Sequence, residues 1–309
     1  MEQVIMCKKL TAIFKEDGVL LSGPHICNLT IEKECKFLVE IEQFGFRKIT
    51  VTSEQDVPAD KLITIFSRIE RLLILFDGVF VSLFQIEFTD SNNATEECLK
   101  ACGNHYMNNR LKYHTSFKFC NIECDRLVNF QDVLTVQLYE RWGDILEELG
   151  IVHQIYLHFM SDNHMPVDVK CAFLIELAEP LVEIVQAFTD NFKTLHPGQE
   201  GTTLKRCLRS LINEYGKDIF NKELSCQRKN RLLTTMINSR VRIMHIKRKH
   251  TGRYFDRKES ILYLMKLSLL YRLIMFKLMG IEDEEYKVAL QKCISRLNAW
   301  DGVLDKFLL

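Results

Sequence analysis

The chain contains 309 residues, a length that favours two domains over one. Hydrophobic residues make up 47% of it and charged residues 27%, proportions that exclude an intrinsically disordered protein. Its formal net charge is zero, so attraction for a polyanion requires a local excess of positive charge.

Cysteine usage and hydropathy indicate a cytoplasmic protein. Eleven cysteines is an odd number, and no secretory signal opens the sequence, so we expect reduced thiols rather than a disulfide scaffold. The most apolar long segment, 261–281, carries Lys266, Arg272 and Lys277. These charges favour a buried helix over a membrane span.

The first part of the chain is rich in β-branched and aromatic residues, which predict strands over 36–42, 48–52, 79–88 and 111–119. Between them, apolar residues at three-and-four spacing predict a helix over 59–76. The polar segment 91–109 is expected to be a loop with a short helical turn. Residues 1–125 are therefore predicted to form a β-rich domain with a sensing or regulatory role.

Four cysteines and two histidines in this part raise the alternative of a zinc site. They are Cys98, Cys102, His105, His114, Cys120 and Cys124. Three residues separate the cysteines of each pair, whereas zinc knuckles usually have two, so ordinary reduced cysteines are the favoured interpretation. Motifs for phosphate loops, dinucleotide binding, serine hydrolases and zinc proteases are absent, and no cofactor is expected.

From about residue 128 the pattern becomes helical. We expect helices over 130–150, 165–192, 204–216, 223–249, 257–280 and 283–300. Gly150 is expected to end the first of these helices and Pro180 to kink the second. The sequence thus predicts an all-helical domain over residues 126–309 and an α+β fold for the whole chain.

Positive charge is concentrated in the helical part. Residues 201–260 contain sixteen Lys/Arg and five Asp/Glu, a local excess of +11 that attracts polyanions. Arg240 and His245 lie in this segment with four residues between them. A histidine can move a proton near neutral pH and an arginine can stabilise a phosphate, so the pair suits metal-independent cleavage of RNA by its own 2′-OH.

The geometry of a regular helix restricts this pair. Five positions along a helix turn the side chain by about 140°. We therefore expect Arg240 and His245 to converge only through a distorted helix or across a two-fold dimer.

The order of the helical segments adds a family resemblance. The segments FLIELAEPLVEIVQ, LKRCLRSLINEYGKDIF, INSRVRIMH and LMKLSLLYRLIMFKLMGI, with Arg-x4-His in the third, resemble the HEPN superfamily of helical nucleases. With a β-rich part in front, the arrangement resembles the ApeA-like abortive-infection proteins. The resemblance covers residues 130–280. It implies a metal-independent endoribonuclease of anti-phage defence, dimeric through its helical domain and activated by a phage-derived or protein trigger at the N-terminal domain.

The resemblance also implies roles for single residues. Arg240 would stabilise the scissile phosphate and His245 would act as general base or acid. Val241 stands where the family usually has a polar residue, so Arg242 or Asn238 would have to orient the pair. The residues expected to bind RNA are Asn238, Arg242, Lys247, Arg248 and Lys249. Two alternatives stay open: a HEPN-like module that binds RNA without cutting it, and an interaction protein of the toxin–antitoxin type.

Overall fold

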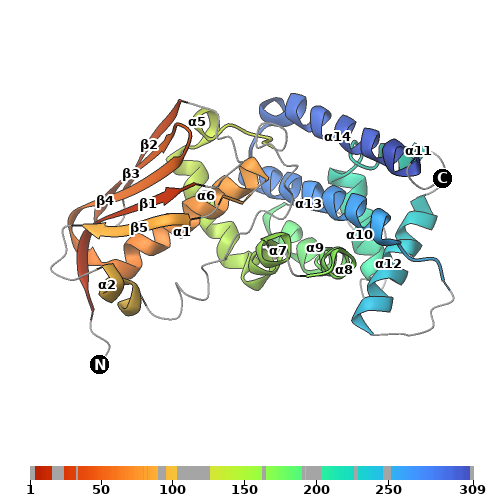
Figure 1. The fold of residues 1–309 in the computed structure, drawn as a ribbon, viewed down its shortest axis with the longest axis horizontal. Helices are drawn as coiled ribbons and strands as arrows, with labels where there is room; N and C mark the ends of the chain where they lie inside the picture. Colours follow the sequence, from red (N-terminus) through yellow and green to blue (C-terminus); the bar gives the residue numbers. More distant parts are fainter. Residues whose placement is uncertain are drawn as a thin grey trace. The chain divides into compact units, whose positions relative to one another are not determined.

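The computed structural model describes residues 4–15, 24–32, 34–78, 80–81, 83–89, 95–102, 126–161, 165–189, 192, 203–225, 229–245 and 252–306. The chain divides into two compact units, residues 1–144 and 145–309. The first contains an antiparallel sheet and the second is helical, which confirms the predicted α+β class (Figure 1).

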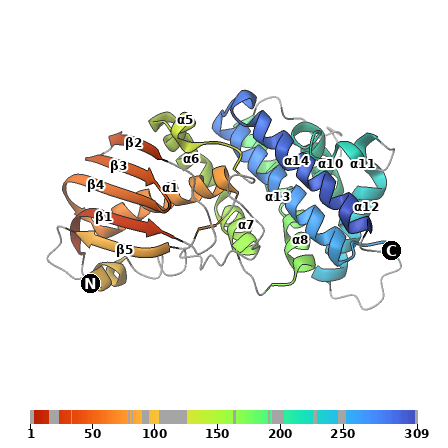
Figure 2. The same ribbon diagram turned by 45° about the horizontal axis from the view of Figure 1, so that its top comes forward.

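The sheet of the first unit has five strands in the order β2-β3-β4-β1-β5 (Figure 2). Each neighbouring pair runs antiparallel. The strands are β1 (Met6–Phe14), β2 (His25–Glu32), β3 (Lys36–Gln43), β4 (Arg47–Pro58) and β5 (Leu83–Thr89). The predicted strands over 36–42, 48–52 and 79–88 are found, while the one over 111–119 lies outside the described residues.

Strands β1 and β2 were not among the predicted strands. In β1 the pairing register with β4 shifts between Cys7 and Lys9, and the burial pattern breaks at the same place. A bulge of this kind interrupts the period-two alternation on which a sequence-based prediction of a strand depends. Strand β2 lies at the edge of the sheet and exposes Ile26, which weakens its alternation as well.

Helix α1 (Ala59–Asp77) supplies the layer that packs on β4 and β1. It buries Leu62, Phe66, Ile69 and Leu73 at three-and-four spacing, as the sequence predicted. The helix ends where Gly78 adopts φ +70° and its N–H bonds to the carbonyl of Ile74, 2.8 Å away. Glycine suits this left-handed conformation because it has no Cβ.

A buried charge cluster closes the C-terminal end of α1. Arg47 Nη2 lies 2.7 Å from Asp77 Oδ2, and Arg126 Nε lies 2.8 Å from Asp77 Oδ1. Arg47 also donates to Gln43, 2.6 Å away. Burial by itself raises the pKa of Asp77, but the charges of the two arginines outweigh it and hold the pKa below its usual value.

The boundary between the units falls inside helix α6 (Val136–Leu149), later in the chain than the change of composition near residue 125. The first part of this helix belongs with the sheet unit because Trp142 is fully buried and its indole N–H donates to the carbonyl of Arg68 in α1, 3.1 Å away. The short helices α2 (Thr95–Ala101) and α5 (Phe130–Val133) also belong to this unit.

The second unit is a bundle in which helix α13 packs against α8, α9, α10 and α14. Its described helices are α7 (Ile151–Ser161), α8 (Val167–Glu176), α9 (Ala178–Phe188), α10 (Leu204–Tyr215), α11 (Asn221–Ser225), α12 (Lys229–Met244), α13 (Arg257–Met279) and α14 (Asp283–Lys306). Helix α7 was not predicted, and the single helix expected over 223–249 is present as α11 and α12.

Helix α13 covers the apolar segment 261–279, which the sequence predicts to be a buried helix. Lys266 is 1% exposed, and its Nζ lies 2.6 Å from Glu223 Oε1 of α11. Arg272 is buried as well. Among the residues that the structure describes, no helix has both the length and the apolar character needed to cross a membrane.

Pro180 interrupts the segment 165–192 more strongly than the expected kink. Helix α8 ends at Glu176 and α9 begins at Ala178, so the proline lies in the first turn of the second helix. A proline ring clashes with the carbonyl four residues earlier and cannot bond to it, and here that carbonyl belongs to Glu176. The break therefore falls before the proline and leaves Glu176 as the last residue of α8.

Candidate functional site

The structure brings Arg240 and His245 together within one chain. Arg240 Nη1 lies 3.2 Å from His245 Nε2. Helix α12 is α-helical to Met244, and the amide of His245 still donates to the carbonyl of Val241, 3.1 Å away. The expectation that the pair needs a distorted helix or a dimer was therefore wrong, because the long arginine side chain spans the angle between the two Cβ directions.

Glu176 holds the opposite side of the same guanidinium. Its two carboxylate oxygens accept from Arg240 Nε and from Nη2, the latter at 2.7 Å. This fork-to-fork geometry is the strongest that the two groups form. The hydrogen bond to Glu176 raises the pKa of Arg240 above its usual value, and the charges of Glu176 and Glu179 add to the effect.

Arg240 still has hydrogen-bonding capacity. A guanidinium carries five N–H donors. Glu176 takes two of them and His245 takes one, which leaves two without an acceptor among the described residues. Arg240 is about a fifth exposed and His245 is exposed, so an outside acceptor such as a phosphate oxygen can reach these donors.

The contact with Arg240 also assigns the donor and the acceptor. An arginine nitrogen only donates, so His245 Nε2 is the acceptor in this hydrogen bond.

Neither residue expected to orient the pair contacts it. Asn238 Nδ2 donates to the carbonyl of Arg253, 2.9 Å away, and the guanidinium of Arg242 stacks on the ring of Tyr254 at 4.0 Å. Glu176, from a different helix, holds Arg240 instead. Sequence reasoning missed Glu176, although Pro180 was a signal that a helix ends four residues before it.

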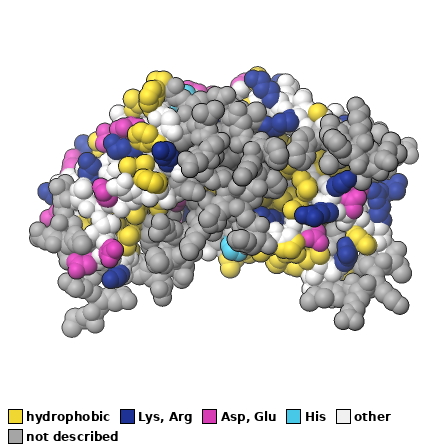
Figure 3. Space-filling view, viewed as in Figure 1, with side chains coloured by type: hydrophobic (Ala, Val, Ile, Leu, Met, Phe, Trp, Pro, Cys, Tyr) yellow, Lys and Arg dark blue, Asp and Glu magenta, His cyan; other side chains and the backbone are white. Residues whose placement is uncertain are grey.

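The basic residues that follow His245 cannot be placed. Lys247, Arg248 and Lys249 lie outside the described residues, so their role in guiding RNA stays a prediction. On the face shown in Figure 3, Lys and Arg side chains gather at the end of the helical unit that carries α12.

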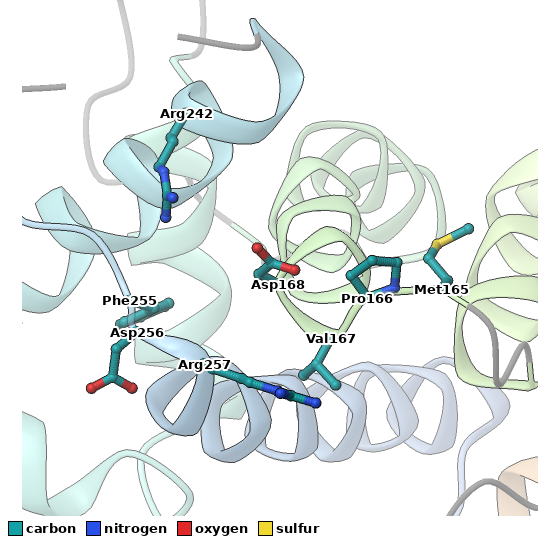
Figure 4. Close-up of a pocket in the computed structure, with 8 residues that line it drawn as sticks. All are labelled: Met165, Pro166, Val167, Asp168, Arg242, Phe255, Asp256 and Arg257. Atoms are coloured by element: carbon teal, nitrogen blue, oxygen red, sulfur yellow. The ribbon is translucent and has the colours of Figure 1, made fainter. Parts of the chain in front are cut away.

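A cavity of about 620 Å³ lies beside the C-terminal end of α12. Its described walls come from the segment that starts α8, from Arg242 of α12 and from the segment that starts α13 (Figure 4). They are formed by Met165, Pro166, Val167, Asp168, Arg242, Phe255, Asp256 and Arg257.

The possible zinc cluster is only partly described. Cys98 and Cys102 are buried, and Cys98 Sγ lies 3.6 Å from Cys7 Sγ. His105, His114, Cys120 and Cys124 lie outside the described residues. Among the residues that are described, no group of three or more His, Cys, Asp or Glu side chains has the geometry of a metal site.

Comparisons with known proteins identify no relative. No protein-family model, no curated protein and no solved structure matches the chain. The function is therefore inferred from the site itself.

Proposed function

We propose that the protein is a metal-independent endoribonuclease in which Arg240 and His245 carry the reaction. The observation that carries the proposal is the 3.2 Å contact between these side chains at an exposed helix end, with two arginine N–H groups left over for a phosphate. The resemblance of the helical segments to HEPN nucleases agrees with it and suggests a place in anti-phage defence.

The proposed reaction uses the 2′-OH of the RNA as nucleophile. Phosphate oxygens accept from the two Arg240 N–H groups that have no acceptor among the described residues, and His245 Nε2 accepts the proton of the 2′-OH once its hydrogen bond with Arg240 breaks. The O2′–P bond forms as the P–O5′ bond breaks, and the leaving 5′-oxygen takes a proton from water. The products carry a 2′,3′-cyclic phosphate and a 5′-OH. Arg240 stabilises the charge on the phosphorane-like transition state.

Glu176 has a positioning role in this scheme. Its paired oxygens fix the plane of the Arg240 guanidinium before RNA arrives, so that the free N–H groups are already aimed. A polar residue after the motif arginine is then unnecessary, and Val241 is compatible with activity.

The second candidate function is RNA binding without cleavage. It is favoured by the same ion pair, because the carboxylate of Glu176 neutralises the arginine that has to stabilise the phosphate. In that case the excess of positive charge over residues 201–260 would attract RNA, and Arg240 would contribute little to binding.

Cleavage of a mixed RNA pool in EDTA separates these functions. The full chain is compared with Arg240→Ala, His245→Ala and Arg231→Ala, the last being an exposed arginine on the same helix. The nuclease predicts cyclic phosphate ends from the parent and from Arg231→Ala, and loss of cleavage in the other two. Salt-sensitive RNA binding without any cleavage would contradict it and favour the binding module.

A further inference from the structure

We infer that the cavity between the start of α8, the end of α12 and the start of α13 binds one ribonucleotide unit of RNA, next to the phosphate that is cut. The inference rests on the proposed function for its RNA substrate. The evidence for it comes from the cavity wall, which combines cationic, anionic and apolar groups (Figure 4).

Two arginines of the wall have no ion pair among the described residues. Arg242 and Arg257 contact no carboxylate in the described part of the chain, whereas the nearby Arg240 and Arg253 pair with Glu176 and with Glu259. The planar donors of two such guanidiniums suit the oxygens of a phosphate.

The two acids of the wall have different environments. The Oδ1 of Asp256 accepts from the backbone N–H groups of Lys258 and Glu259, both at 2.8 Å, as the cap of α13. In Figure 4 its carboxylate points away from Arg242 and Arg257. Asp168 is half-buried at the cavity, and its Oδ1 accepts from the backbone N–H of Val169, 3.1 Å away. Its other oxygen can accept a hydrogen bond from a ribose hydroxyl or from an amino group of a base.

The remaining wall is apolar. Met165, Pro166 and Val167 lie together on one side, and the ring of Phe255 lies on the other, held by stacking on Tyr263 at 4.2 Å between ring centres. Apolar groups at a cavity wall suit contact with the faces of a base. The cavity volume also lies in the range of small-molecule sites, about 300 to 1,000 Å³.

The position of Arg242 connects the cavity to the proposed reaction. Arg242 and His245 are three residues apart, and residues at this spacing are neighbours on a helix surface. The guanidinium of Arg242 is also held in place by the Tyr254 ring. A nucleotide whose phosphate reaches Arg242 therefore has its next phosphate close to His245.

The test measures binding of single mononucleotides to the full chain by calorimetry, with AMP, GMP, CMP and UMP as probes. Inorganic phosphate and dAMP are the reference ligands. Arg257→Gln should weaken the best mononucleotide by about tenfold or more. Asp168→Asn should reduce the preference for AMP over dAMP or for one base over another. The matched control, Arg231→Gln, should bind like the parent.

The outcomes separate this inference from the proposed function. If Arg257→Gln binds mononucleotides like the parent, or if inorganic phosphate binds as tightly as AMP, the cavity is not a nucleotide site, whatever the cleavage assay shows. If mononucleotide binding depends on Arg257 but the parent does not cut RNA, the nucleotide site stands and the nuclease proposal fails. If Arg257→Gln weakens both mononucleotide binding and RNA cleavage, the result supports both the nucleotide site and the nuclease proposal.

Discussion

Arg240 Nη1 lies 3.2 Å from His245 Nε2, while the carboxylate of Glu176 accepts hydrogen bonds from the other side of the same guanidinium. The arginine is thus held from two directions by residues of one chain. A dimer is not needed to assemble the pair, so a dimer of the helical domain, if it forms, would act by bringing two complete pairs together.

Replacing Glu176 tests whether it positions Arg240. Glu176→Ala releases the guanidinium and should lower the kcat of RNA cleavage by roughly ten- to a hundredfold, because small losses of alignment have large effects on rate. RNA binding should strengthen, since a negative charge is removed from the site. The measurement is kcat and KM on one short RNA, together with the salt dependence of binding.

Glu179 provides a matched control for this change. It acts on Arg240 through its charge, and no hydrogen bond joins the two. Glu179→Gln should therefore leave kcat within about twofold of the parent. An equal loss of kcat in both variants would show that charge, not alignment, explains the role of Glu176.

The buried cluster around Asp77 should control the stability of the first unit. Asp77→Asn leaves Arg47 and Arg126 without a counter-charge and should lower the free energy of unfolding by about 3 kcal/mol. The measurement is urea denaturation of the full chain at pH 7. Glu54→Gln, which removes an exposed ion pair with Lys36, should change stability by less than about 1 kcal/mol.

The effect of Asp77 should depend on pH in one direction. Its pKa in the folded protein lies below its usual value, so its contribution is complete above the unfolded pKa. The contribution is lost as the pH falls through the folded pKa. The difference between the parent and Asp77→Asn should therefore shrink in acid, and a difference that stays constant from pH 7 to 3 would refute the assignment.

The N-terminus of α13 should depend on its capping box. Asp256 accepts from two backbone N–H groups, and the side chain of Glu259 accepts from the backbone N–H of Asp256 at 3.1 Å. Asp256→Ala should lower the free energy of unfolding by about 1 kcal/mol. Asp256→Ser, which keeps a capping oxygen, should recover most of the loss. Equal stability of the two variants would argue against the cap.

Cys102 should react slowly with alkylating reagents in the folded protein. Burial raises its pKa to about 12, so the reactive thiolate is rare at pH 8. Iodoacetamide labelling followed by mass spectrometry should modify the half-buried Cys35 well before Cys102. In urea the two should react at similar rates. Fast labelling of native Cys102 would show that the thiol is accessible.

Much of the local structure could be predicted from the sequence. The apolar spacing in 59–76 predicted α1, Gly150 ends α6 as expected with φ +47°, and the charges in 261–281 indicated a buried helix. Arg240 and His245 were candidate residues from their types, their spacing and the order of the helical segments around them. These features depend on contacts within a few residues, so the local pattern contains the information.

Some predictions were wrong for reasons that are also local. The register shift in β1 hid its alternation. The kink expected from Pro180 is a break at Leu177, because the clash of a proline falls on the residue four positions before it. In both cases the prediction used the spacing of apolar residues alone. A bulge or a proline removes backbone hydrogen bonds, and this spacing does not record their loss.

The tertiary structure decided which residues surround Arg240 and line the cavity. Glu176 reaches Arg240 across 64 positions of sequence, and three segments that are distant in the chain form the cavity beside α12. By itself, the sequence determined which residues could do chemistry and which helix carries them. Packing of α8 against α12 and of α13 against α8 decided which partners they have, because contacts between helices depend on side-chain fit across the bundle and leave no periodic signal in the sequence.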